Sequence, residues 1–147
     1  MDTAWASIAR HISEATGTPF AVRSQSAVGG GCINSAAVLQ DGNRRYFIKL
    51  NEAARLAMFE AEAEGLREIA GSHSVRVPLP VCAGTAGGSA FLVLEHLDLA
   101  GADGRSLERL GRELAQMHRA TQKQFGWRHD NTIGSTPQIN TPAELFL

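Results

Sequence analysis

A run of three glycines at positions 29–31 constrains this chain more than any other feature, because it lies between two segments rich in β-forming residues. Glycine alone lets a backbone bend sharply and approach a bound group closely without a steric penalty. A glycine-rich turn followed by small polar residues presents successive backbone N–H groups, which suits an anion such as a phosphate. Residues 28–35 are therefore interpreted either as a phosphate-binding turn or as a flexible hairpin tip.

A lysine and a glutamate further along the chain bear on that choice. Lys49 ends a predicted strand, and Glu62 falls on the apolar stripe of a helix predicted over 52–71. A carboxylate on a core-facing stripe is costly to bury unless a cation pairs with it, and Lys49 is the candidate. A strand lysine paired with a helix glutamate behind a glycine-rich hairpin is the arrangement with which the kinase fold holds phosphates. The alternative is a partly exposed Glu62 at the edge of the stripe. Glu64 and Glu68 need no such partner, because they can reach the wet flanks of the helix.

The composition fits one folded core. With 147 residues, 44% of them hydrophobic and 20% charged, the chain has a globular composition and can enclose one core but hardly two. The net charge of −1 argues against an extended nucleic-acid surface. Cys32 and Cys82 make neither a disulfide framework nor a metal site. With no leader-like start and no membrane-length apolar stretch, we expect a cytoplasmic setting and neither a nucleic-acid nor a membrane partner.

The chain divides into two predicted parts, 1–97 and 98–147. The first is predicted to hold a helix capped by Asp2 or Thr3 and ending near residue 15, the helix over 52–71, and strands at 20–28, 33–39, 44–50, 81–84 and 90–95. The second opens with a helix over 106–118, capped by Ser106, and continues through 125–140 as a long ordered loop without periodicity. This order predicts three antiparallel strands followed by a helix and then by two further strands.

Six short motifs follow one another in this order: Gly29-Gly30-Gly31-Cys32-Ile33-Asn34, Tyr46-Phe47-Ile48-Lys49, Phe59-Glu60-Ala61-Glu62-Ala63, Phe91-Leu92-Val93-Leu94-Glu95-His96-Leu97, Leu114-Ala115-Gln116-Met117-His118-Arg119, and residues 125–140. Together they resemble the N-terminal half of the fructosamine kinase (ketosamine kinase) family. These proteins are relatives of the aminoglycoside phosphotransferases and choline kinases, within the protein-kinase-like fold. The resemblance therefore implies an α+β fold, in which a kinase-like N-lobe with an antiparallel sheet of about five strands plus a helix is followed by the first helix and loop of the helical C-lobe.

The resemblance implies ATP-dependent phosphorylation of the sugar 3-hydroxyl of ketosamines, either small molecules or protein-bound adducts of glycation. The phosphorylated adduct then breaks down spontaneously and frees the amine. By position, Lys49 and Glu62 take the catalytic places, with Lys49 on the α- and β-phosphates of ATP and Glu62 holding it. The implied nucleotide-binding residues are Gly29, Gly30, Gly31, Cys32, Ile33 and Asn34 over the phosphates, Lys49, and Glu95, His96 and Leu97 along the adenine edge.

The chain also departs from the family pattern. Phe47 stands where protein kinases keep a small residue against the adenine. The family's His-Gly-Asp catalytic loop and metal-binding aspartate do not occur before Leu147, so the general base and the Mg²⁺ ligands are expected downstream, and no metal ligand is assigned. Residues 1–147 alone are expected not to turn over. The helix over 106–118 is expected to expose apolar surface, with a homodimer or disorder of the last forty residues as consequences.

Alternatives remain open for several side chains. His118 is interpreted as a packed histidine rather than a catalytic one, Asp130 and Asn131 as structural or substrate-lobe residues, and Cys82 as inert. Cys32 is hypothesised to be an oxidation-sensitive thiol or to link two chains through a disulfide. Trp127 lines either a sugar pocket or the underside of a loop. For the whole chain, the rival hypotheses are a phosphotransferase for another small alcohol, such as an aminoglycoside or choline, and a non-catalytic nucleotide-binding fragment.

Overall fold

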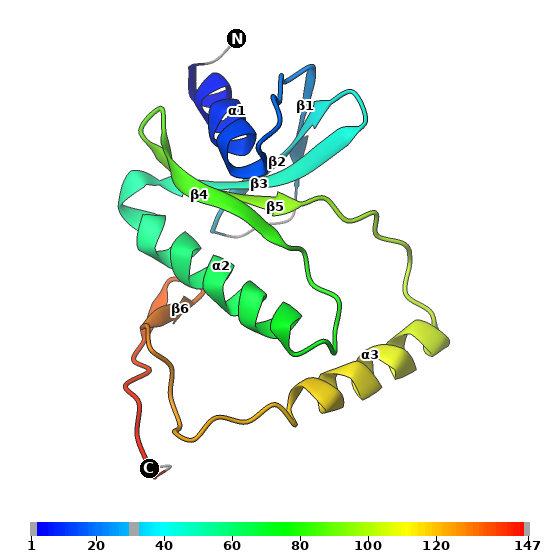
Figure 1. The fold of residues 1–147 in the computed structure, drawn as a ribbon, viewed down its shortest axis with the longest axis vertical. Coiled ribbons are helices and arrows are strands. Elements are labelled where there is room, and N and C mark those ends of the chain that lie inside the picture. Colours follow the sequence, from blue (N-terminus) through cyan, green and yellow to red (C-terminus); the bar gives the residue numbers. More distant parts are fainter. Residues whose placement is uncertain (1–2, 30–32, 146–147) are drawn as a thin grey trace.

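An antiparallel five-stranded sheet organises the computed structural model, which describes residues 3–29 and 33–145 (Figure 1). The spatial order is β1-β2-β3-β5-β4, so β3 lies in the middle and β5 between β3 and β4. Helix α1 covers one face and helix α2 the other. The bounds are α1 Thr3–Thr16, β1 Ser24–Val28, β2 Ser35–Asp41, β3 Arg44–Glu52, a 3-10 turn Ala53–Arg55, α2 Leu56–Gly71, β4 Pro80–Ala86 and β5 Ser89–Glu95.

The sheet is buried on both sides at β5, because residues 90–94 of this strand are all apolar. On β5, Phe91 and Val93 face α1, whereas Leu92 and Leu94 face α2. The α1 side forms the larger cluster, with Ile8 and Ile12 of the helix fully buried against the sheet. Full burial of a side chain of this size contributes about 1.5–3 kcal/mol. The sheet and its two helices therefore form a three-layer core.

Helix α2 packs on the sheet through one stripe of apolar side chains. Phe59 is fully buried and Ala63 nearly so, and both pack against Leu92 and Leu94 of β5. On β3, Phe47 packs in this same cluster while Ile48 packs in the opposite one, as the predicted alternation requires. The sequence therefore predicts correctly which face of β3 carries Phe47 and Lys49.

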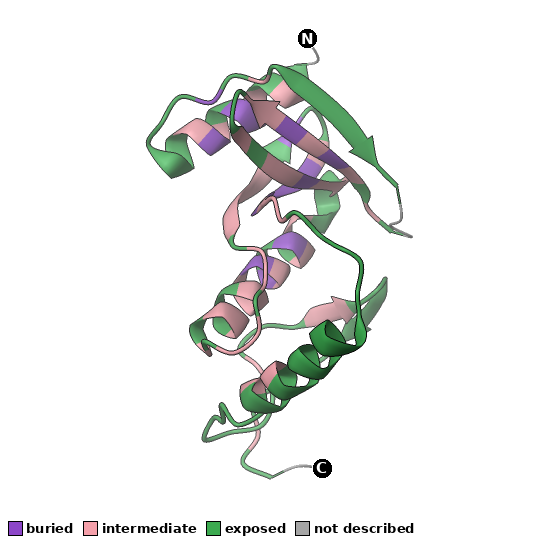
Figure 2. Ribbon diagram, turned by 90° about the vertical axis from the view of Figure 1, so that its right-hand side faces the viewer, coloured by how far each residue is buried: buried purple, intermediate pink, exposed green. Residues whose placement is uncertain are grey.

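The second part of the chain lies beyond this sheet. Helix α3 spans Gly104–Met117, and none of its residues, all of them described, is buried (Figure 2). Leu107, Leu110 and Leu114 expose 58%, 48% and 42% of their surface, which agrees with the expected uncovered apolar face. Past α3 the chain returns beneath α2 as a short hairpin of β6, Asn131–Ile133, and β7, Thr136–Gln138 (Figure 1).

Several predicted boundaries need correction. Strand β1 begins at Ser24 rather than at residue 20, because Phe20 packs into the α1 cluster, although the Arg23 N–H still donates to the Gln40 carbonyl. Helix α3 is capped by Asp103, whose side chain accepts from the Ser106 N–H, while the Ser106 hydroxyl accepts from the Asp103 N–H. The ordered loop predicted over 125–140 contains regular structure where β6 and β7 pair. Asp2, one of the two caps proposed for α1, lies outside the described residues.

Candidate nucleotide-binding site

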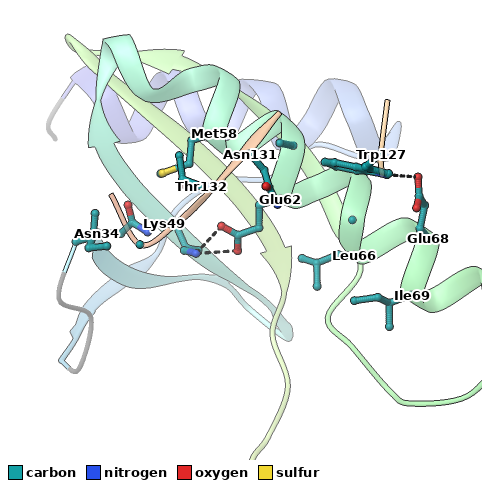
Figure 3. Close-up of a pocket in the computed structure, with 14 residues that line it drawn as sticks. Asn34, Lys49, Met58, Glu62, Leu66, Glu68, Ile69, Trp127, Asn131 and Thr132 are labelled. Carbon is teal, nitrogen blue, oxygen red and sulfur yellow. Dashed lines mark hydrogen bonds and ion pairs between the residues drawn. The ribbon is translucent and has the colours of Figure 1, made fainter. Parts of the chain in front are cut away.

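A two-pronged ion pair joins the sheet to α2. The Lys49 ammonium lies 2.7 Å from Glu62 Oε1 and 2.6 Å from Oε2 (Figure 3). The lysine comes from the central strand β3, opposite Ala36 and Leu92, and the glutamate comes from the second turn of α2. Their side chains are 22% and 31% exposed, so both groups keep contact with solvent. The pair predicted from the two periodicities is thus present, and its ammonium faces an accessible space.

That space is a cavity of about 590 Å³ between α2 and the β6–β7 hairpin. Lys49 and Glu62 lie at one end, and Trp127 lies toward the other (Figure 3). Its lining residues are Ile33, Asn34, Lys49, Met58, Ala61, Glu62, Gly65, Leu66, Glu68, Ile69, Trp127, Asn131, Thr132 and Gly134. A cation held in a cavity of this size can meet an anionic group without moving away from its carboxylate partner.

The glycine-rich turn meets this cavity at its C-terminal end. Ile33 and Asn34 line the cavity, and the Asn34 side-chain oxygen accepts a 2.6 Å hydrogen bond from Asn51 at the end of β3. Gly29 is exposed at the end of β1. The other three residues proposed for the turn, Gly30, Gly31 and Cys32, lie outside the described residues, so their predicted part in phosphate binding stays a prediction.

A second cavity of about 600 Å³ opens where β5 leaves the sheet. It is lined by Val28, Val38, Phe47, Arg76, Pro78, Leu94, Glu95, His96, Leu97, Asp98 and Leu99. The three residues proposed for the adenine edge, Glu95, His96 and Leu97, therefore share one cavity with apolar side chains of β1, β2 and β3. An apolar slot beside an exposed backbone segment suits a flat heteroaromatic base.

Two comparisons with known proteins bear on this arrangement. The fructosamine kinase family model matches residues 4–146. The chain belongs to this family. A probable ketoamine kinase of Synechocystis sp. is 47% identical over 137 residues, which cover 92% of this chain and 46% of that protein. A chloroplastic protein-ribulosamine 3-kinase of Arabidopsis thaliana is 49% identical over 119 residues, covering 78% of this chain and 36% of that protein.

A solved structure agrees with the family assignment. The crystal structure of a protein provisionally named fructosamine-3-kinase from Haemophilus somnus matches with a TM-score of 0.90 and 27% sequence identity, over 97% of this chain and 48% of that one. The protein-kinase-like fold predicted from the sequence is thus confirmed. The chain spans about half the length of these family members or less.

Metal ligands are a separate matter for this fructosamine kinase family chain. Among residues 3–29 and 33–145, no group of three or more His, Cys, Asp and Glu side chains could hold a metal ion. The Mg²⁺ ligands that the resemblance implies stay predicted downstream. In the same described part, no helix has the length and apolar character needed to cross a membrane.

Two glutamates of α2 have partners that the sequence interpretation did not foresee. Glu64 and Glu68 were expected on wet flanks of the helix. Instead, Trp127 Nε1 donates to Glu68 at 2.8 Å, His129 Nε2 lies 2.6 Å from Glu64, and Arg128 bonds to Glu64. The i, i+4 spacing puts the two glutamates on one side of the helix, but it does not identify Trp127, Arg128 and His129 as their partners.

The remaining expectations for single side chains have mixed outcomes. His118 is exposed, so the prediction that its side chain is packed is wrong. Asp130 and Asn131 both accept hydrogen bonds from Asn140 and thus take structural parts in their loop. Cys82 is half-buried, and burial raises the pKa of its thiol to about 11, which agrees with an inert cysteine.

Glu95 is anchored at the mouth of the second cavity. Its carboxylate accepts from Arg76 at 2.5 Å and from the Leu79 N–H at 3.1 Å. The hydrogen bond from Arg76 is the largest cause that holds the pKa of this carboxyl below its usual value of 4.5. Desolvation opposes it, and the Leu79 hydrogen bond and the Arg76 charge lower the pKa further. The anchored side chain fixes the course of the backbone from β5 into residues 96 and 97.

This anchoring predicts an acid-side stability difference. Because the folded-state pKa of Glu95 is lowered, its contribution to the free energy of unfolding is present above the unfolded-state pKa and is lost as the pH falls through the folded-state pKa. We expect Glu95→Gln to lower stability at about pH 6 and to have less effect at about pH 3, measured by urea unfolding. Exposed Glu60→Gln is the control. An equal cost of Glu95→Gln at both pH values would contradict the assignment.

Proposed function

We propose that residues 1–147 are the nucleotide-holding portion of an ATP-dependent ketosamine 3-kinase. The observation that carries the proposal is the Lys49–Glu62 pair, which faces a cavity bounded by Asn34 at the end of the glycine-rich turn. Family membership gives the reaction class, since two relatives are named a ketoamine kinase and a protein-ribulosamine 3-kinase. On this proposal, residues 1–97 hold ATP and residues 98–147 begin the lobe that binds the acceptor.

The proposed roles follow from charge and position. Lys49 contacts the α- and β-phosphates, and Glu62 keeps its ammonium oriented toward them while the turn from Gly29 to Asn34 covers the phosphates. Backbone groups at Glu95 and Leu97 meet the adenine edge. The ketosamine 3-hydroxyl gives its proton to the base predicted downstream. Its oxygen forms a bond to the γ-phosphorus as the bond from that phosphorus to the β,γ-bridging oxygen breaks, and ADP leaves. What these residues supply is positioning and charge neutralisation.

The proposal is tested by calorimetric titration of purified residues 1–147 with ATP, followed by an ATP-consumption assay with fructoselysine and magnesium. We expect saturable ATP binding and no turnover, because the His-Gly-Asp segment that supplies the base in this fold does not occur in the sequence. Absence of ATP binding would overturn the nucleotide-holding role. Magnesium-dependent turnover by residues 1–147 would refute the expected inactivity of the fragment while supporting the kinase assignment.

The acceptor is tested with a protein that spans the full length of the relatives. A panel of fructoselysine, ribuloselysine, an aminoglycoside and choline separates a ketosamine kinase from the rival phosphotransferases. We expect phosphate transfer to the ketosamines alone. Transfer to choline or the aminoglycoside in preference to both ketosamines would assign the chain to the rival class.

A further inference from the structure

The segment from Phe125 to Asn140 contacts α2 on a side of the helix that does not face the sheet. Glu64 and Glu68 are one helical turn apart and so share one side of α2. Arg128 bridges them, bonding to Glu64 and lying 3.3 Å from Glu68 Oε1. Together with the contacts of Trp127 and His129, three consecutive residues bind two carboxylates of the helix.

The same segment is closed into a loop by hydrogen bonds between its two ends. The Trp127 N–H donates to the Asn140 carbonyl at 2.7 Å, and the Asn140 side-chain amide donates to the His129 carbonyl at 3.0 Å and to Asn131 Oδ1 at 2.9 Å. Gly126 has φ +92°, and a Cβ built on it would lie 2.6 Å from the Asn140 carbonyl oxygen. A left-handed glycine in this close approach lets the two strands of the loop meet.

The same loop also reaches the end of the glycine-rich turn. Beyond Trp127 the chain forms the β6–β7 hairpin, whose Gly134 lies against Ile33, since a Cβ built on it would be 3.3 Å from the Ile33 side chain. Asn131, Thr132 and Gly134 therefore wall the cavity that contains the Lys49–Glu62 pair (Figure 3). One continuous segment thus contacts α2, the cavity and the turn.

Fixing a helix about its own axis takes contacts on more than one side. Phe59 and Ala63 seat α2 on the sheet, and the Glu64–Glu68 side lies about 100° further round the helix from Ala63. In the described part of the chain, no side-chain hydrogen bond caps the start of α2 at Arg55. A rotation of α2 about its sheet contact would carry Glu62 away from Lys49, and the 125–140 contacts oppose that rotation.

We propose that residues 125–140 position α2 so that Glu62 meets Lys49, with Trp127 and Arg128 as positioning residues for nucleotide phosphate binding. The role in phosphate binding rests on the proposed function, whereas the positioning of α2 against Lys49 does not. A segment from the second part of the chain thereby controls an ion pair in the first. Contacts made by the lobe that binds the acceptor would thus affect phosphate binding in the lobe that binds ATP.

Lysine labelling tests the proposal without any nucleotide. The sequence has two lysines, Lys49 and Lys123, so exposed Lys123 is an internal reference for acylation measured by mass spectrometry. An ammonium held by two carboxylate oxygens is less available to an amine-reactive reagent than a free one. We expect Arg128→Ala and Trp127→Phe to raise the acylation rate of Lys49, relative to that of Lys123, by about fivefold. This factor corresponds to the largest stabilisation that is typical of an exposed ion pair.

Controls separate positioning from a merely structural role. Arg112→Ala removes an exposed arginine–glutamate pair on α3 and is expected to leave Lys49 labelling unchanged. Trp127→Phe keeps the aromatic ring and removes only the N–H donor, so it tests the contact should Arg128→Ala fail to fold. A lower free energy of unfolding with unchanged Lys49 labelling in Trp127→Phe would overturn the proposal.

Nucleotide affinity supplies the second readout. We expect Arg128→Ala to weaken ATP binding about fivefold, and to have no further effect when Glu62 is already replaced by Gln, because both changes remove the same orientation of Lys49. Additive losses in the double variant would contradict action through Glu62. Should wild-type residues 1–147 bind no ATP, the proposed function fails, and the Lys49 labelling rates still decide whether the segment positions α2.

Discussion

Lys49→Met is expected to weaken ATP binding by residues 1–147 by about 10- to 100-fold, which corresponds to the ~1.5–3 kcal/mol of a hydrogen bond between charged groups. Methionine keeps the length and apolar stem of the lysine but removes the cation that would meet the phosphates. The Glu62 carboxylate is then left without its partner at the same end of the cavity. An uncompensated carboxylate there repels a phosphate, which adds to the loss.

The stability of the fold is expected to change far less than its affinity. Lys49 and Glu62 remain 22% and 31% exposed, so solvent screens the pair, and its loss is expected to change the free energy of unfolding by less than about 1 kcal/mol. Calorimetric titration with ATP and urea unfolding on the same samples measure the two quantities. A large loss of affinity with little loss of stability is the result that identifies a binding residue.

Two variants control this experiment. Lys123→Met removes a lysine from the exposed segment after α3 and is expected to bind ATP as the wild type does. Lys49→Arg keeps the charge but presents a planar fork in place of a compact ammonium, so we expect an intermediate affinity. ATP binding by Lys49→Met at the wild-type affinity would remove Lys49 from the site.

The Lys49–Glu62 pair could be predicted because two periodicities determine it. A strand alternates its side chains, which places Lys49 on the same face as Phe47, and a helix repeats every 3.6 residues, which places Glu62 beside the stripe of Phe59. The structure puts Phe47 and Phe59 in one cluster between β3 and α2. Local pattern is therefore enough to predict that the two charges meet.

The contacts of the 125–140 segment could not be predicted in the same way. Trp127 and Glu68 are 59 residues apart, and β6 and β7 have three residues each, too few for an alternation to be recognised. The loop around them is closed by the hydrogen bond from the Trp127 N–H to the Asn140 carbonyl, next to the left-handed Gly126, and neither Asn140 nor Gly126 has a periodic signature. Glu64 and Glu68 were consequently expected in water, although each has partners in this segment.

His118 shows the opposite error. The apolar spacing over 106–118 predicts a helix correctly, and it also suggested that His118 packs at the end of an apolar face. In the structure, Leu110 and Leu114 are exposed and so is His118. A helical pattern specifies which residues share a face, but burial of that face depends on a second surface, which local sequence does not describe.

Phe59→Ala and Phe91→Ala are expected to cost about 3–5 kcal/mol of unfolding free energy each, a large fraction of the ~5–15 kcal/mol typical of a whole domain. Both rings are fully buried, Phe59 between α2 and the sheet and Phe91 between α1 and the sheet. Urea unfolding measures the two losses. Leucine at either position fills more of the space than alanine, so Phe59→Leu and Phe91→Leu are expected to cost less.

Affinity for ATP separates these two equally damaging changes. The Lys49 ammonium lies 5.8 Å from the centre of the Phe59 ring, and Phe59 precedes Glu62 by one helical turn, so a cavity at Phe59 loosens the helix that holds the pair. Phe91 lies on the opposite face, where its ring meets His11 of α1. We therefore expect Phe59→Ala, but not Phe91→Ala, to weaken ATP binding at temperatures where both variants remain folded. Equal losses of affinity would mean that overall stability, rather than the packing of α2 on the sheet, determines the affinity for ATP.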